Sequence, residues 1–183
     1  MAFALVERYG SPQTLAAAHE EWTVAELPEP ADRSIGMGDT IAAVFVQLLG
    51  ICFLTWQMGL ADTTASDLAA TPFLDPSLAD FWLPFFVVVL SVAVLFELIK
   101  AAVGHWTMPL AIGNTIVNAA FAIPLVWLLV TQPVLNPAFA AAMGWDVSAD
   151  SATSIQQGVA VLVILGTAWD CVDGWWRALR ADT

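Results

Sequence analysis

The sequence has few charged residues, and very few of them are basic. Asp, Glu, Lys and Arg make up 12% of the 183 residues, about half the share that soluble domains carry. Five residues are Lys or Arg and seventeen are Asp or Glu, which gives a formal net charge of −12. So few basic residues argue against a surface that binds nucleic acid or anionic lipid headgroups. We therefore expect no nucleic-acid partner.

Residues that usually hold disulfides, metals or cofactors are also scarce. Cys52 and Cys171 both lie inside apolar runs and indicate neither a disulfide framework nor a zinc site. His19 and His105 lie outside the middle of any apolar run, which excludes a haem held by two intramembrane histidines. The chain has no P-loop, Gly-x-Gly-x-x-Gly, His-Glu-x-x-His or Gly-x-Ser-x-Gly motif. We predict no catalytic, cofactor-binding or metal-binding residues, and no enzymatic activity.

Long apolar stretches are what the chain does have. Hydrophobic residues account for 59% of it, and they gather in four stretches that are each long enough to cross a hydrocarbon core of about 30 Å. The runs lack the alternation of barrel strands, so helices are required to satisfy the backbone in lipid. We predict an all-α polytopic membrane protein. Its four-helix transmembrane domain covers residues 35–183, with spans at about 37–60, 81–103, 108–131 and 155–176.

The basic residues predict the orientation of these spans. With four spans, all five fall on one side of the membrane, and the loops 61–80 and 132–154 carry only acidic charge. The positive-inside rule then places both termini in the cytoplasm. We expect the membrane to be the plasma (inner) membrane. The five residues are Arg8, Arg33, Lys100, Arg177 and Arg180.

Residues 1–34 form a separate cytoplasmic segment with the signals of two short helices. Gly10 is a typical residue to end the first, and Ser11 with Pro12 is a typical start for the second, which runs to about Trp22. So small a helical pair has little core of its own. We expect it to pack against the membrane domain, a second copy of the chain or another protein.

Several short motifs resemble one protein family. The stretch Leu-Val-Glu-Arg-Tyr-Gly-Ser-Pro-Gln-Thr-Leu-Ala at 5–16 is similar to the closing helix–turn–helix of the HAAS domain. The segment 106–114 with Asn118, the segment 135–137 and the closing segment 169–174 are similar to the membrane part of those proteins. The resemblance implies a small cytoplasmic helical module before several membrane spans, in a family often encoded beside a PadR-like transcriptional regulator. The chain begins where that module is nearly complete, so we expect its first helix or helices to be missing.

Polar side chains near the cytoplasmic ends of spans two to four form a candidate intramembrane cluster. Ionisable residues are costly in lipid, so each one needs an explanation. Glu97 and Lys100 are three residues apart, and Asp173 and Arg177 are four apart, so both pairs share a helix face and favour local ion pairs. The cluster consists of Glu97, Lys100, His105, Asn114, Asn118, Asp170 and Asp173.

Asp170 and the two asparagines have no such partner on their own helix. Asn114 and Asn118 lie one turn apart, a spacing that suits hydrogen bonds between helices, and Asp170 has no basic residue at i+3 or i+4. If spans two to four are neighbours, the cluster is a polar network that fixes helix register. The alternatives are a proton- or cation-responsive carboxylate at Glu97 facing the bundle interior, and a divalent metal held by Glu97, Asp170 and Asp173.

Three functions from different classes remain. The family resemblance favours a non-catalytic, membrane-anchored regulatory or signalling protein that acts through protein–protein contacts. The alternative is an accessory structural subunit of a larger membrane complex. A small transporter or channel that uses the polar cluster is the third, and it would need several copies of the chain to form a pathway. The expected partners are the lipid bilayer and other membrane or cytoplasmic proteins, a second copy of the chain included.

Overall fold

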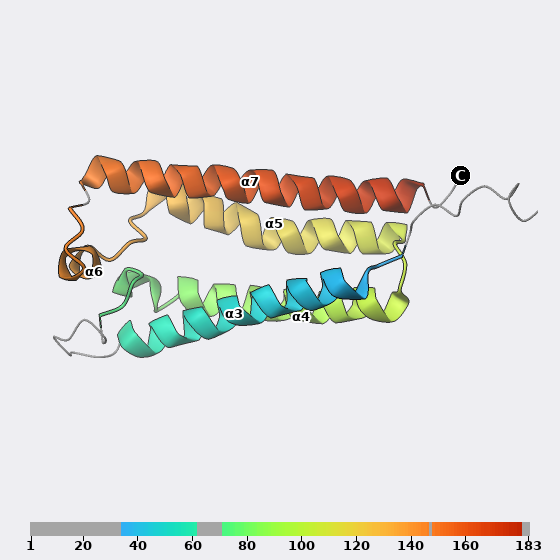
Figure 1. Cartoon of the computed structure of the whole chain (residues 1–183), viewed down its shortest axis with the longest axis horizontal. Coiled ribbons are helices and arrows are strands. Elements are labelled where there is room, and N and C mark those ends of the chain that lie inside the picture. The colour runs from blue at the N-terminus through green and yellow to red at the C-terminus, as the bar shows by residue number, and fades with distance from the viewer. Residues whose placement is uncertain (1–33, 62–70, 147, 181–183) are drawn as a thin grey trace, which may run out of the picture. The chain divides into compact units, whose positions relative to one another are not determined.

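The computed structural model describes residues 34–61, 71–146 and 148–180, all of which belong to one compact unit, Asp32–Thr183. The predicted helices within residues 1–34 lie outside the described residues. The described part consists of four long helices, α3 (Met37–Ala61), α4 (Trp82–Val103), α5 (Met108–Thr131) and α7 (Ala149–Leu179). Two short helices, η3 (Pro76–Leu78) and α6 (Pro137–Ala142), lie in the connections (Figure 1).

All four long helices are long and apolar enough to cross a membrane, which confirms the predicted all-α, four-helix fold class. The first three differ from the predicted spans by at most one residue at either end. Their ends follow from local chemistry. Gly104, at φ 75°, ends α4 with its N–H bonded to the Lys100 carbonyl, and Thr107 caps α5 by accepting from the Leu110 N–H.

The fourth helix is longer than predicted. It begins at Ala149, six residues before the predicted start of span four at 155, because the hydroxyl of Ser148 caps it by accepting from the Ser151 N–H at 3.2 Å. Its 31 residues extend about 46 Å, more than a hydrocarbon core of about 30 Å requires. The first two turns of α7 are polar, so a search for apolar runs passes over them.

The long helices pack as two antiparallel pairs. Helix α3 lies along α4, helix α5 lies along α7, and α4 contacts α5 to join the pairs (Figure 1). The α4–α5 approach is close at Gly113, where an added Cβ would lie 2.7 Å from Cε2 of Phe96. At Gly174 of α7, an added Cβ would lie 3.0 Å from the ring of Trp106. Glycine therefore lets α4 and α5 approach each other at residue 113 and lets the ring of Trp106 pack against α7 at residue 174.

An apolar core holds one end of the bundle together. It consists of Leu78 of η3, Leu83 and Phe86 of α4, and Leu128 of α5, all of them buried. The ring of Phe86 is 5.7 Å from that of Phe121, between centroids. We call this end of the bundle, the left-hand end in Figure 1, the loop end.

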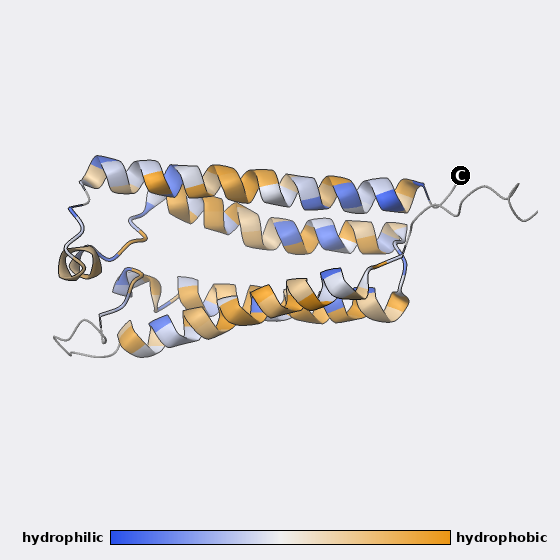
Figure 2. Ribbon diagram, in the orientation of Figure 1, coloured by the Kyte–Doolittle hydropathy of each residue, from blue (hydrophilic) through white to orange (hydrophobic). Residues whose placement is uncertain are grey.

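Much of the outer surface is apolar. The middle of α7 is predominantly hydrophobic and its two ends are more hydrophilic (Figure 2). Large side chains stand exposed along the outside of α7, among them Leu162, Trp169 and Val172, and α3 exposes Ile41 and Phe45 in the same way. Apolar surface of this extent is normal where a helix faces lipid tails and marks an interaction surface elsewhere.

Candidate functional site

Basic side chains lie at only one end of the described bundle, whereas acidic side chains lie at both ends. Lys100, Arg177 and Arg180 lie at the end where α4 and α7 finish and where α3 and α5 begin. We call this the basic end; it is the right-hand end in Figure 1. The loop end carries only acidic charge among the described residues, namely Asp75, Asp80, Asp146 and Asp150.

A buried ion pair lies in the last two turns of α4. The Lys100 ammonium donates to Oε1 of Glu97 at 2.8 Å, and the two side chains are only 8% and 12% exposed. The ammonium also lies over the ring of Trp106, 5.1 Å from its centroid. Lys100 is the only lysine of the chain. An isolated charge is costly at membrane depth, so this pairing lowers the cost for both groups.

Asp170 of α7 is held by both asparagines of α5. The side-chain amides of Asn114 and Asn118 each donate to Oδ2 of Asp170 at 2.6 Å. Because the asparagines are one helical turn apart, the carboxylate lies between two successive turns of α5. The Lys100 ammonium lies 3.5 Å from Oδ1 of Asn114 and so links this group to the ion pair.

Five of the seven predicted cluster residues are therefore brought together across α4, α5 and α7. We call this set the polar network; its members are Glu97, Lys100, Asn114, Asn118 and Asp170. Asp173 instead forms an ion pair with Arg177 at 2.8 Å, with side chains 41% and 33% exposed. Pairs of that exposure contribute little to stability.

His105 lies apart from the polar network. Its side chain is exposed, and its Nδ1 lies 2.9 Å from the Val103 carbonyl oxygen in the short connection between α4 and α5. Its backbone pairs with that of Ser34. The sequence predicts His105 in the cluster because it lies near the same ends of the spans, but its exposed ring lies in the connection and outside the polar network.

Two small cavities adjoin the polar network. The outer cavity, of about 200 Å³, lies at the basic end and is lined by α3, α4 and α7. The inner cavity, of about 350 Å³, is lined by all four long helices. Glu97 and Asp170 line both. Thr40 lines the outer cavity and Gln47 the inner one, and each has a buried side-chain oxygen without a hydrogen-bond partner.

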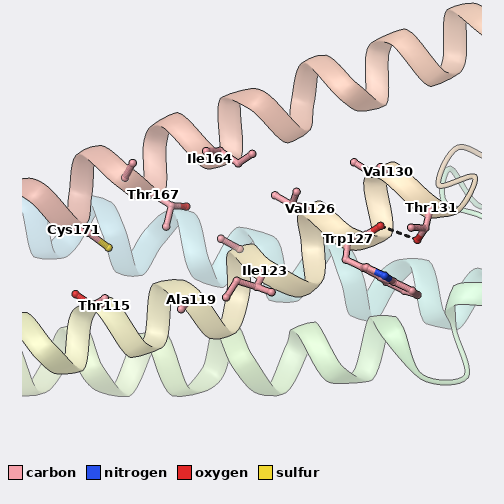
Figure 3. Close-up of a pocket in the computed structure, with 12 residues that line it drawn as sticks. Thr115, Ala119, Ile123, Val126, Trp127, Val130, Thr131, Ile164, Thr167 and Cys171 are labelled. Atoms are coloured by element: carbon pink, nitrogen blue, oxygen red, sulfur yellow. Dashed lines mark hydrogen bonds between the residues drawn. The ribbon is translucent and has the colours of Figure 1, made fainter.

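A wider, apolar groove runs between α5 and α7 (Figure 3). It measures about 570 Å³, and small residues such as Ala119, Ala122 and Ala168 contribute to its walls. Trp127 and Thr131 lie toward its loop end, and Thr115 and Cys171 toward its basic end (Figure 3). Its walls belong to α5 and α7, which are both long and apolar enough to cross a membrane.

Sequence reasoning missed several residues of this region. Thr40, Gln47 and the hydrogen bond from Trp175 to the Thr115 hydroxyl, at 2.9 Å, are all absent from the predicted cluster. Each of these residues is a single side chain within an apolar run, and no spacing in the sequence predicts its partner or its place at a cavity. Thr115 also bonds the Ala111 carbonyl of its own helix, the usual arrangement for a threonine in a membrane helix.

The arrangement is suited to holding helices together. Glu97 and Asp173, two of the three carboxylates considered for a divalent metal, are each paired with a basic residue. No group of three or more His, Cys, Asp or Glu that could hold a metal is present among the described residues.

The chain matches no protein-family model, and no curated protein or solved structure is significantly similar to it. Of the segments that carry the HAAS-like resemblance, 5–16 lies outside the described residues. The segment 106–114 spans the α4–α5 connection and the start of α5, and the segment 169–174 lies on α7 and contains Asp170.

Proposed function

We propose that this chain is a non-catalytic integral membrane protein that presents residues 1–33 to a cytoplasmic protein partner and acts as a membrane-anchored regulatory or signalling protein. The observation that carries the proposal is the segregation of the basic residues to one end of the bundle. Every basic residue among the described residues lies at the basic end, where α3 begins. All the charged residues described at the loop end are acidic.

This segregation supports an orientation. Loops rich in Lys and Arg stay in the cytoplasm, so the basic end faces the cytoplasm and the loop end faces outward. Both termini are then cytoplasmic, in the plasma (inner) membrane. Residues 1–33 precede α3 directly and carry two further basic residues, Arg8 and Arg33, which favours the same side.

The polar network supports a structural role for the membrane domain. Its side chains form hydrogen bonds and an ion pair with one another across three helices, and such contacts fix helix register. The regulatory role itself rests on the resemblance of residues 5–16 to the HAAS module. In that view the four spans anchor and orient the segment, and the segment makes the contact that carries the signal.

An accessory subunit of a larger membrane complex is the second candidate. The specific observation in its favour is the apolar outer surface of α7, where Leu162, Trp169 and Val172 are 69%, 75% and 65% exposed. A neighbouring membrane protein can cover such a surface as well as lipid can. Partner crosslinking from two positions distinguishes the two functions.

A photoreactive amino acid at Gln13 reports on the cytoplasmic segment, and one at Leu162 reports on the outer face of α7. The regulatory proposal predicts a crosslink from Gln13 to a soluble cytoplasmic protein in intact cells, and only lipid adducts from Leu162. The same probe at Met143, which is exposed at the loop end, serves as a matched control and should capture no cytoplasmic protein.

The outcomes separate the candidates. A crosslink from Leu162 to a different integral membrane protein, with none from Gln13, would favour the accessory subunit. Crosslinks only between copies of the chain would show a homo-oligomer and contradict both. A protein-free result at both positions would also contradict both.

A further inference from the structure

The two cavities at the polar network have features of a ligand site that the helix-packing role leaves unexplained. Thr40, in the first turns of α3, is 5% exposed, and its hydroxyl has no hydrogen-bond partner although it lines the outer cavity. Burying a hydroxyl without a hydrogen-bond partner is energetically unfavourable. Polar atoms of this kind are normally satisfied by water or by a bound group.

The outer cavity has an excess of negative charge. Four carboxylates line it and only two basic groups do, the Lys100 ammonium and the Arg177 guanidinium, each of which is paired with one of the four. Asp170 is one of the two carboxylates without a basic partner, and its hydrogen bonds come from neutral amides. The four carboxylates are Asp39, Glu97, Asp170 and Asp173.

The inner cavity carries polar groups farther into the bundle. Gln47 follows Met37 by ten residues on α3, about 15 Å along the helix and so near the middle of a 30 Å core. Its buried Oε1 has no partner and lines this cavity with Asn118 and Asp170. Phe121 also lines it and contacts Phe86 of the apolar core. Polar groups thus extend from the basic end to the middle of the bundle.

We propose that these cavities form a vestibule, open at the basic end, that binds a small monovalent cation such as an alkali-metal or ammonium ion beside Asp170. A carboxylate together with the neutral, unpartnered oxygen of Thr40 suits a cation. One unpaired carboxylate at the shared wall of the cavities favours a monovalent ion over a divalent one, which takes several carboxylates. The inference is independent of the regulatory proposal and of the orientation of the bundle.

Thiol accessibility tests the vestibule directly. Gln47→Cys is made in a chain with Cys52→Ala and Cys171→Ala, and the protein in lipid nanodiscs is labelled with a cationic and with an anionic methanethiosulfonate. His105→Cys, exposed at the basic end and outside both cavities, provides the reference ratio of the two rates. The cationic preference is the ratio of the cationic to the anionic labelling rate. We expect this ratio at residue 47 to exceed the reference ratio at residue 105 about tenfold, which corresponds to about 1.4 kcal/mol of electrostatic selectivity.

Asp170→Asn should lower that preference severalfold, because the amide keeps an acceptor for the asparagines but removes the charge. Sodium, potassium and ammonium are then compared as protecting ions at constant ionic strength, and the ion that slows labelling identifies the occupant. Thr40→Val, which has the same shape and loses no hydrogen bond, should weaken protection at least threefold while the chain stays folded.

Three results would overturn the proposal. The first is a preference at residue 47 equal to the reference, and the second is no labelling of residue 47 by either reagent. The third is a lack of protection by all three ions. Failure of this test leaves the crosslinking result untouched, because the two experiments probe different parts of the chain.

Discussion

Lys100→Met is expected to destabilise the folded bundle by roughly 3–5 kcal/mol, because removing one partner of a buried ion pair leaves the other charge uncompensated. The remaining charge is Glu97, whose side chain is only 12% exposed. The Lys100 ammonium also contacts Oδ1 of Asn114 and the ring of Trp106, so its loss affects α5 as well as α4. The measurement is the free energy of unfolding in detergent micelles or bicelles, read by circular dichroism or by steric trapping.

The matched control removes both charges. Glu97→Gln combined with Lys100→Met leaves no uncompensated charge and should recover most of the loss, since neutral replacements of buried pairs are often tolerated. A Lys100→Met protein within about 1 kcal/mol of the unchanged chain would show that Glu97 reaches water or a headgroup cation. That result would contradict the buried pair.

Asp170→Leu is expected to weaken the association of α5 with α7 by about 2 kcal/mol, while Asp170→Asn costs less than about 1 kcal/mol. Leucine leaves the amides of Asn114 and Asn118 without their acceptor, and side-chain hydrogen bonds in membranes contribute from about 0.6 to 1.7 kcal/mol each. Asparagine retains a carbonyl oxygen that can accept. The measurement is the folding stability of the protein after insertion into the membrane. Insertion efficiency is unsuitable, because leucine itself favours insertion and would mask the effect.

Asn118→Leu provides an independent arm, because it removes one of the two donors and leaves Asp170 bonded to Asn114. Its cost should fall between those of the two Asp170 variants. Equal stability of Asp170→Leu and Asp170→Asn would mean that the carboxylate does not hold the helices together.

The helices could be predicted well because their signals are local. Apolar length set the spans, and the ends of α4 and α5 follow from Gly104 and Thr107 within the same few residues. The first turns of α7 lie outside the predicted span, which begins at about 155, because they are polar and exposed and so do not contribute to an apolar run. The cap at Ser148 was a usable signal, but serines are common in loops too.

In the site, contacts within one helix could be predicted from the sequence, and contacts between helices could be predicted only in part. Glu97 with Lys100 and Asp173 with Arg177 were predicted as pairs because i,i+3 and i,i+4 spacings are fixed by one helix. The spacing of Asn114 and Asn118 predicted bonds to another helix, but their acceptor depends on how α5 and α7 are rotated.

Contacts that depend wholly on how the helices pack could not be predicted from the sequence. Gln57, fully buried on α3, accepts from the Leu74 N–H at 3.0 Å and so ties the helix to the connection before η3. Nothing near Gln57 in the sequence specifies that partner. The cavity residues Thr40 and Gln47 were missed for the same reason.

The account depends most on which end of the bundle faces the cytoplasm. The direct measurement uses single cysteines at Ala141, exposed in α6 at the loop end, and at His105, at the basic end, in the chain with Cys52→Ala and Cys171→Ala. A membrane-impermeant maleimide is applied to intact and to permeabilised cells. We predict that Ala141→Cys is labelled in intact cells and that His105→Cys is labelled only after permeabilisation; the reverse pattern would place residues 1–33 outside and contradict the proposed function.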